Sequence, residues 1–163
     1  MTRDDIFDSL EVMWSERDPV PAGLVERMQA VAAAEVALAD TDLDYELMLL
    51  IERSTELAGT RGTSTAYTLR FGTDNLDLLV RAGGGNGGTN GTTRLDGWIV
   101  PPAPVTVRAT RIEHGSTEEQ SWEVAVDAQG RFEFAELPAG LYRLWLTPRD
   151  DDAKAFGTPA FEI

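Results

Sequence analysis

The sequence lacks cysteine altogether and has one histidine among its 163 residues. Without cysteine the chain forms no disulfide framework, no thiolate zinc site and no cysteine nucleophile. A Ser-His-Asp arrangement would depend entirely on His114, which lies in a polar turn between two predicted strands. Adjacent residues on a strand point to opposite faces, so Glu113 is poorly placed to orient His114, and the sequence has no Gly-x-Ser-x-Gly elbow. We therefore expect a protein that is not an enzyme.

Metal ligands are equally scarce. A site built without cysteine would depend on carboxylates, and the tight acidic cluster of the chain is Asp150-Asp151-Asp152. This cluster lacks the alternating ligand spacing and the glycine of an EF-hand loop. Runs of like charge are usually solvated, so we expect a solvated turn with at most a weak Ca²⁺ contact, and neither a metal nor a cofactor.

Long apolar runs are absent. The longest, such as Leu47–Ile51, are far shorter than the ~18 residues that span a bilayer. The first 14 residues contain no basic segment followed by an apolar run, which a secretory signal would need. We expect a cytoplasmic protein that does not associate with a membrane.

Basic residues are few, with 14 Lys and Arg against 28 Asp and Glu, so the net charge is −14. This balance argues against a nucleic-acid partner, because binding a phosphate backbone needs clustered Lys and Arg. The charge is uneven, since residues 1–57 carry 14 acidic and 4 basic side chains. A concentrated negative charge speeds association with a basic surface, so we expect a basic protein partner for this segment.

The apolar pattern of residues 1–57 is helical and predicts two or three helices in an acidic module. The first helix has an apolar stripe that includes Phe7, Leu10 and Trp14, and it is expected to stop at Pro19. Pro21 is expected to open the second helix. A third helix is predicted over 45–54, although the run Leu47–Ile51 also fits a buried strand. Phe7, Leu10 and Trp14 are the candidate partner-binding residues, but such stripes more often pack against their own domain.

From residue 60 to 163 the pattern changes to short runs that alternate or are continuously apolar, separated by turn residues. Eight such runs predict an antiparallel β-sandwich or barrel of seven to eight strands. The fold class is therefore α+β, with N-terminal helices followed by a β-sandwich. The predicted strands span 67–71, 76–80, 95–100, 105–112, 122–126, 132–134, 141–146 and 159–163.

A glycine-rich segment, 83–91, lies between two of these strands. It lacks the Gly-Lys-Ser/Thr ending of a P-loop and follows a strand without opening a helix, so a flexible hairpin connection is expected. Trp98, Trp122 and Trp145 lie in predicted strands, where large aromatic side chains usually fill the core.

Residues 124–146 contain Asp-x-x-Gly-x-Phe-x-Phe followed by Leu-Pro-x-Gly-x-Tyr. This pattern resembles carboxypeptidase regulatory-like domains, which are prealbumin-like β-sandwiches, and the resemblance extends over about 94–163. In it, Asp127–Gly130 is expected to form a hairpin turn, and Phe132 and Phe134 to point into the core. Tyr142 and the following apolar residues are expected to alternate beyond a corner shaped by Pro138 and Gly140.

The whole layout is similar to that of small uncharacterised actinobacterial proteins that are often encoded beside extracytoplasmic-function-type sigma factors. That resemblance implies a regulatory protein partner. We therefore expect a non-catalytic interaction protein, with an anti-sigma or sigma-accessory factor as the specific case. The alternative is a carbohydrate- or peptide-binding β-sandwich module, which predicts an exposed aromatic row or a concave pocket on a sheet.

Overall fold

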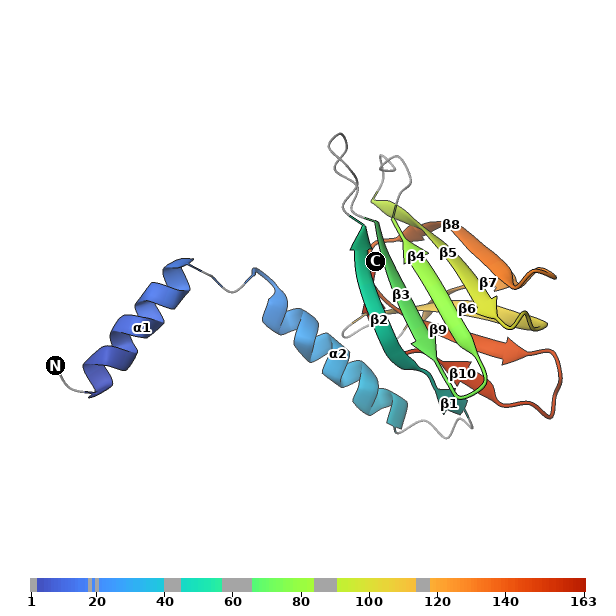
Figure 1. Ribbon diagram of the computed structural model, residues 1–163, viewed down its shortest axis with the longest axis horizontal. Helices are drawn as coiled ribbons and strands as arrows, with labels where there is room; N and C mark the ends of the chain where they lie inside the picture. The colour runs from blue at the N-terminus through green and yellow to red at the C-terminus, as the bar shows by residue number, and fades with distance from the viewer. Residues whose placement is uncertain are drawn as a thin grey trace.

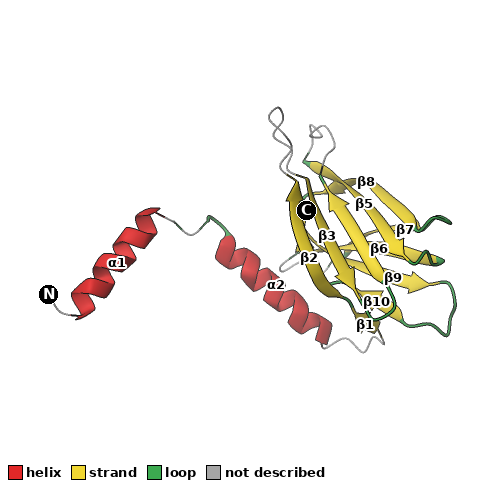
Figure 2. Cartoon of the chain, viewed as in Figure 1, coloured by secondary structure: helices red, strands yellow, loops and turns green. Residues whose placement is uncertain are grey.

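The computed structural model describes residues 3–17, 19, 21–39, 45–56, 66–83, 91–113 and 118–163. Within these ranges the chain begins with two helices, α1 (Arg3–Arg17) and α2 (Leu24–Ala39), and continues with strands alone. The strands are β1 (Tyr45–Leu47), β2 (Leu49–Glu56), β3 (Ala66–Gly72), β4 (Asp77–Ala82), β5 (Thr92–Val100), β6 (Val105–Ile112), β7 (Gln120–Ala125), β8 (Arg131–Pro138), β9 (Leu141–Pro148), β10 (Ala155–Gly157) and β11 (Phe161–Glu162). The α+β class is confirmed, and strand is the dominant element (Figure 2).

The strands form two sheets. One has the order β2-β3-β4-β5-β8, and the other has the order β1-β10-β9-β6-β7, with β11 also paired to β9. A single apolar cluster draws side chains from both sheets, including Phe71 and Phe132 from the first and Tyr142 and Leu144 from the second. We call β1–β11 together the two-sheet body.

Each of the eight predicted strand runs overlaps a strand of the structure, from β3 to β9 and β11. Three further strands extend the sheets: β1 and β2, and the short β10, which carries no alternating run in the sequence. The expectation of wholly antiparallel pairing is wrong at one place, because β1 runs parallel to β10.

The prediction of a third helix over 45–54 is wrong, because this segment forms β1 and β2. Its backbone groups pair with the sheets: β1 lies along β10, β2 lies along β3, and the Met48 amide donates to the Gly157 carbonyl at 2.8 Å. Met48 is fully buried, whereas its neighbours Leu49 and Leu50 are exposed. Edge pairing therefore overrides a helical period that this short apolar run also fits.

The two predicted N-terminal helices are present. α1 ends at Arg17, before Pro19, as expected. Pro21 lies in a turn before α2 rather than at its first position, since the Leu24 amide donates to the Pro21 carbonyl at 3.1 Å. Gly23 precedes the helix with a φ of 77°, a backbone conformation that glycine adopts without a Cβ penalty.

Within the motif at residues 124–146 the chain crosses from one sheet to the other twice. Asp127 organises the first crossing, because its side chain accepts hydrogen bonds from the Gln129 and Arg131 amides at 2.9 and 2.8 Å. This turn joins β7 to β8, which belong to different sheets, so the expected hairpin is wrong and the turn is a crossover. At the second crossing the Tyr142 hydroxyl donates to the Pro138 carbonyl at 2.7 Å and holds the corner between β8 and β9.

The expected burial of this motif is confirmed. Phe132 and Phe134 are both buried, as are Tyr142 and the alternate residues Leu144 and Leu146. The glycine-rich segment joins β4 to β5, which are antiparallel neighbours, so its expected place as a hairpin connection is confirmed. Residues 84–90 of that segment lie outside the described residues.

Candidate functional site

Helix α1 lies apart from the strands in Figure 1, with α2 between it and the two-sheet body. Five of its apolar side chains share an arc of about 120° when successive residues are placed 100° apart: Ile6, Phe7, Leu10, Met13 and Trp14. The three predicted partner-binding residues lie in this arc, with exposed fractions of 54% for Phe7, 40% for Leu10 and 60% for Trp14. The apolar stripe is thus presented to solvent instead of being packed against the chain's own core.

The carboxylates of α1 lie mainly on the side of the helix opposite this stripe. Within Arg3–Arg17 the sequence has five acidic and two basic residues. Val12, which is also exposed, lies on the opposite side of the helix from the stripe. The stripe carries the spacing i, i+3, i+7 at Phe7, Leu10 and Trp14, which is the spacing of anchors in helices that bind in a groove.

Helix α2 is attached to the two-sheet body through a buried arginine. Arg143 of β9, whose side chain is 6% exposed, donates through Nη2 to the Glu35 carboxylate at 2.6 Å. Its Nε donates to the carbonyl of the buried Thr158 at 2.9 Å. A second ion pair joins Arg27 of α2 to Glu162 at 3.6 Å, but both of these side chains are largely exposed, so it contributes little. Glu35 is therefore the main polar attachment of α2 among the described residues.

An exposed apolar segment on β1 and β2 was missed by the sequence reasoning. Leu47, Leu49, Leu50 and Ile51 are all more than two-fifths exposed, and β2 is the edge strand of its sheet. The sequence marks this segment only by a compact apolar run, and that pattern fits a helical face or a buried strand instead of an exposed one. Its exposure follows from the edge position of β2, which sequence periodicity does not show.

The three strand tryptophans do not form a row on one face. Trp122 packs against the core cluster and lies 5.9 Å, centroid to centroid, from Tyr142. Trp98 lies on β5 and Trp145 on β9, which belong to different sheets. Each is half-buried, and the residues before and after it in the strand are buried and point to the other face. The expectation that all three fill the core is therefore wrong for Trp98 and Trp145, because alternation along β5 and β9 turns them outward. The aromatic row that sugar stacking predicts is not formed by these side chains.

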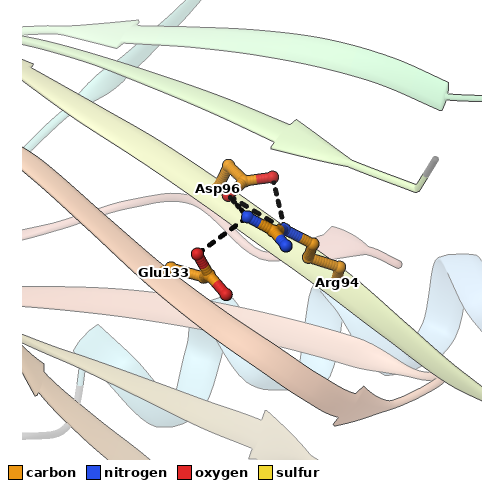
Figure 3. A network of polar contacts seen from close by, with 3 residues as sticks. All are labelled: Arg94, Asp96 and Glu133. Carbon is orange, nitrogen blue, oxygen red and sulfur yellow. Dashed lines mark hydrogen bonds and ion pairs between the residues drawn. The ribbon is translucent and has the colours of Figure 1, made fainter. Parts of the chain in front are cut away.

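A polar network lies on β5 and β8 (Figure 3). Asp96 and Glu133 are direct cross-strand partners, and like charges in such positions repel. Arg94 bridges them, because its Nη2 donates to Asp96 at 3.0 Å and to Glu133 at 2.7 Å. The hydrogen bond to Asp96, together with the charge of that carboxylate, raises the pKa of Arg94 above its ordinary value. Arg94 therefore offsets the repulsion between these two carboxylates and ties β5 to β8.

Two further candidates from the sequence are His114 and the acidic run Asp150–Asp152. His114 lies outside the described residues. Asp150 begins an exposed turn, in which its carbonyl accepts a hydrogen bond from the Ala153 amide at 3.1 Å. Across the described ranges, no group of three or more His, Cys, Asp or Glu side chains is arranged to hold a metal ion. No helix in the same ranges has the length and apolar character to cross a membrane.

Comparison with known proteins gives no further guide, since no protein-family model, curated protein or solved structure matches this chain. A function for the protein is therefore inferred from the geometry of α1, α2 and the two-sheet body.

Proposed function

We propose that the protein is a non-catalytic interaction protein that acts as an anti-sigma or sigma-accessory factor in the cytoplasm, where its partner resides. The observation that carries the proposal is the exposed apolar stripe of α1, on a helix whose other side carries carboxylates. The two-sheet body then serves as a scaffold, and we propose that it is a β-sandwich of the carboxypeptidase regulatory-like kind.

The physical argument concerns the stripe first. Aromatic side chains dominate the energetics of interfaces, and the two aromatic residues of α1, Phe7 and Trp14, are both more than half exposed. An amphipathic helix that presents anchors at i, i+3 and i+7 fits an apolar groove about one helix wide. The proposed partner surface is thus a groove rather than a flat face.

Charge defines the rim of that groove. Glu11 and Glu16 of α1 are exposed beside the apolar arc, whereas Asp5 and Asp8 are exposed on the opposite side of the helix, and the chain as a whole has a net charge of −14. A groove rimmed with Lys and Arg complements this helix, increases the association rate and makes that rate depend on salt. The resemblance of the whole layout to proteins encoded beside sigma factors supplies the proposed identity of the partner.

The test is a calorimetric titration of the full-length chain with an extracytoplasmic-function-type sigma factor from the same genome, carried out at two salt concentrations. A chain carrying Phe7→Ala, Leu10→Ala and Trp14→Ala should bind at least about 100-fold more weakly, because each buried anchor is worth roughly 2 kcal/mol. The matched control is Val12→Ala, which removes an equally exposed side chain from the opposite side of α1. Its affinity should be unchanged.

Equal binding by the wild-type chain and the triple variant would exclude α1 as the contact. An equal loss in Val12→Ala would show that the effect is not specific to the stripe. Failure of the wild-type chain to bind would exclude the sigma factor as partner.

A further inference from the structure

A cavity of about 340 Å³ lies between α2 and the two-sheet body. This volume is at the lower end of the range that small-molecule sites occupy. Helix α2 forms one wall through Ala30 and Val31, and the other walls are formed by β2 and β3 of one sheet and by β9 and β11 of the other. The cavity is therefore bounded by α2 and by strands of both sheets, and it is separate from the stripe on α1.

The inner part of the cavity is apolar. Leu69 and Phe71 of β3 meet Phe161 of β11 there, and all three belong to the core cluster. The Phe71 and Phe161 rings lie 5.6 Å apart, centroid to centroid. An apolar chain or ring that enters the cavity would lie against these side chains and lose its contact with water, which is favourable.

The mouth of the cavity is polar and carries more positive than negative charge. Arg27 and Arg53 line it, together with Glu162 as the one carboxylate among the lining residues. Arg27 Nε lies 3.6 Å from Glu162, while Arg53 is positioned over the Tyr67 ring at 5.4 Å and has no carboxylate partner in the described part of the chain. The Tyr67 hydroxyl, also at the mouth, donates to the main-chain carbonyl of Glu162.

A local excess of arginine is unusual in this acidic chain. Guanidinium groups bind carboxylates through planar, paired hydrogen bonds. Tyr67 adds no negative charge at the mouth, because a phenol is neutral at physiological pH and burial raises the pKa of this one further, to about 12. The charge of the mouth thus favours an anion, and the apolar inner part favours a hydrocarbon.

We propose that this cavity binds a small apolar carboxylate, such as a medium-chain fatty acid, with its chain against Leu69, Phe71 and Phe161 and its carboxylate at Arg53 and Arg27. Because α2 forms one wall, a bound ligand joins this helix to the two-sheet body. Ligand binding therefore stabilises the folded chain by mass action. This proposal does not depend on the partner assigned to α1.

The test is isothermal calorimetry of the full-length chain with octanoate, and with 1-octanol as the uncharged probe of similar length. We expect saturable binding of one octanoate per chain and at least about tenfold weaker binding of 1-octanol. Arg53→Gln should weaken octanoate binding about tenfold, the equivalent of one charge-assisted hydrogen bond. Arg108→Gln, which changes an exposed arginine on β6, should leave the affinity unchanged.

A second pair of variants tests whether octanoate binds in this cavity. Ala30→Phe fills the cavity from α2 and should abolish octanoate binding, whereas Ala33→Phe adds the same ring on the exposed side of that helix and should not. Circular dichroism and the thermal unfolding midpoint establish that each variant is folded.

Absence of octanoate binding to the wild-type chain would overturn the proposal. Equal affinities for octanoate and 1-octanol would overturn the role of the arginines. Equal binding by folded Ala30→Phe and Ala33→Phe would exclude this cavity as the site.

Discussion

Replacing Glu35 by glutamine removes the negative charge that α2 places against the buried Arg143. In the wild-type chain the guanidinium donates to Glu35 at 2.6 Å and to the Thr158 carbonyl at 2.9 Å, and it lies 5.9 Å from the centre of the Trp145 ring. Glutamine keeps an oxygen acceptor at the same place, whereas Glu35→Ala removes the acceptor as well. The two substitutions therefore separate the contribution of the charge from that of the hydrogen bond.

The expected loss of stability depends on how deeply each member of the Arg143–Glu35 pair is buried. A hydrogen bond to a charged group contributes about 1.5–3 kcal/mol. Arg143 is almost completely buried, but the Glu35 side chain is 40% exposed, which screens the interaction. We expect a loss of about 1 kcal/mol in the free energy of unfolding for Glu35→Gln and about 2 kcal/mol for Glu35→Ala.

Urea denaturation of the full chain measures this loss, with hydrogen exchange of the α2 amides as a second observable. With an m-value of about 2 kcal/mol/M, the midpoint should fall by roughly 0.5 M for Glu35→Gln and 1 M for Glu35→Ala. The matched control is Glu26→Gln on the exposed side of α2, which should change stability by less than about 0.5 kcal/mol. Unchanged midpoints and unchanged α2 exchange in both Glu35 variants would refute the attachment of α2 through Arg143.

Two further predictions concern the two-sheet body. Gly130→Ala should lower the free energy of unfolding in urea by more than about 2 kcal/mol, because φ is +81° and the new Cβ would clash with the Ile99 carbonyl. Gly91→Ala is the control, because Gly91 has a φ of +67° but open space around an added Cβ, so this variant should show the cost of backbone strain alone. Equal losses of unfolding free energy in the two variants would contradict the clash at Gly130. Burial raises the pKa of both Tyr67 and Tyr142 to about 12, so the contribution of these two groups to folding stability should be constant below pH 10. It should fall between pH 10 and 12, by on the order of 2 kcal/mol for Tyr142 and less for the more exposed Tyr67. Urea denaturation between pH 10 and 12 measures the fall in stability, and tyrosinate absorbance measures the ionisation of the two groups. Ionisation of both groups near pH 10 in the folded chain would contradict the raised pKa values.

The strand pattern of the body could be predicted because alternation has a direct physical cause. One face of each strand contacts the shared core, so apolar residues recur at every second position, as they do at Tyr142, Leu144 and Leu146. The partition of strands between sheets could not be predicted in the same way. The turn at Asp127–Gly130 has the residues of a hairpin, yet β7 and β8 pair with different neighbours, and that choice depends on contacts distant in sequence.

The candidate site was predicted in part. The residues of the α1 stripe follow from helical periodicity, but their exposure does not, since a stripe of this kind usually packs against its own domain. The concentration of charge in a helical segment 1–57 was overestimated. Residues 45–56 belong to the sheets, and residues 1–39, which include both helices, carry eight acidic and three basic side chains, a net charge of −5. The cavity beneath α2 combines residues from three distant parts of the chain, so no local pattern could reveal it.

The central claim is that α1 is the surface that contacts the partner, and hydrogen exchange of the full chain tests it most directly. An isolated helix of 15 residues is marginally stable in water, so the amides of 3–17 should exchange rapidly in the free protein. In the presence of saturating sigma factor these amides should become protected, because the helix is then held in a groove. Protection confined to the two-sheet body, with α1 exchanging as rapidly as before, would contradict the account.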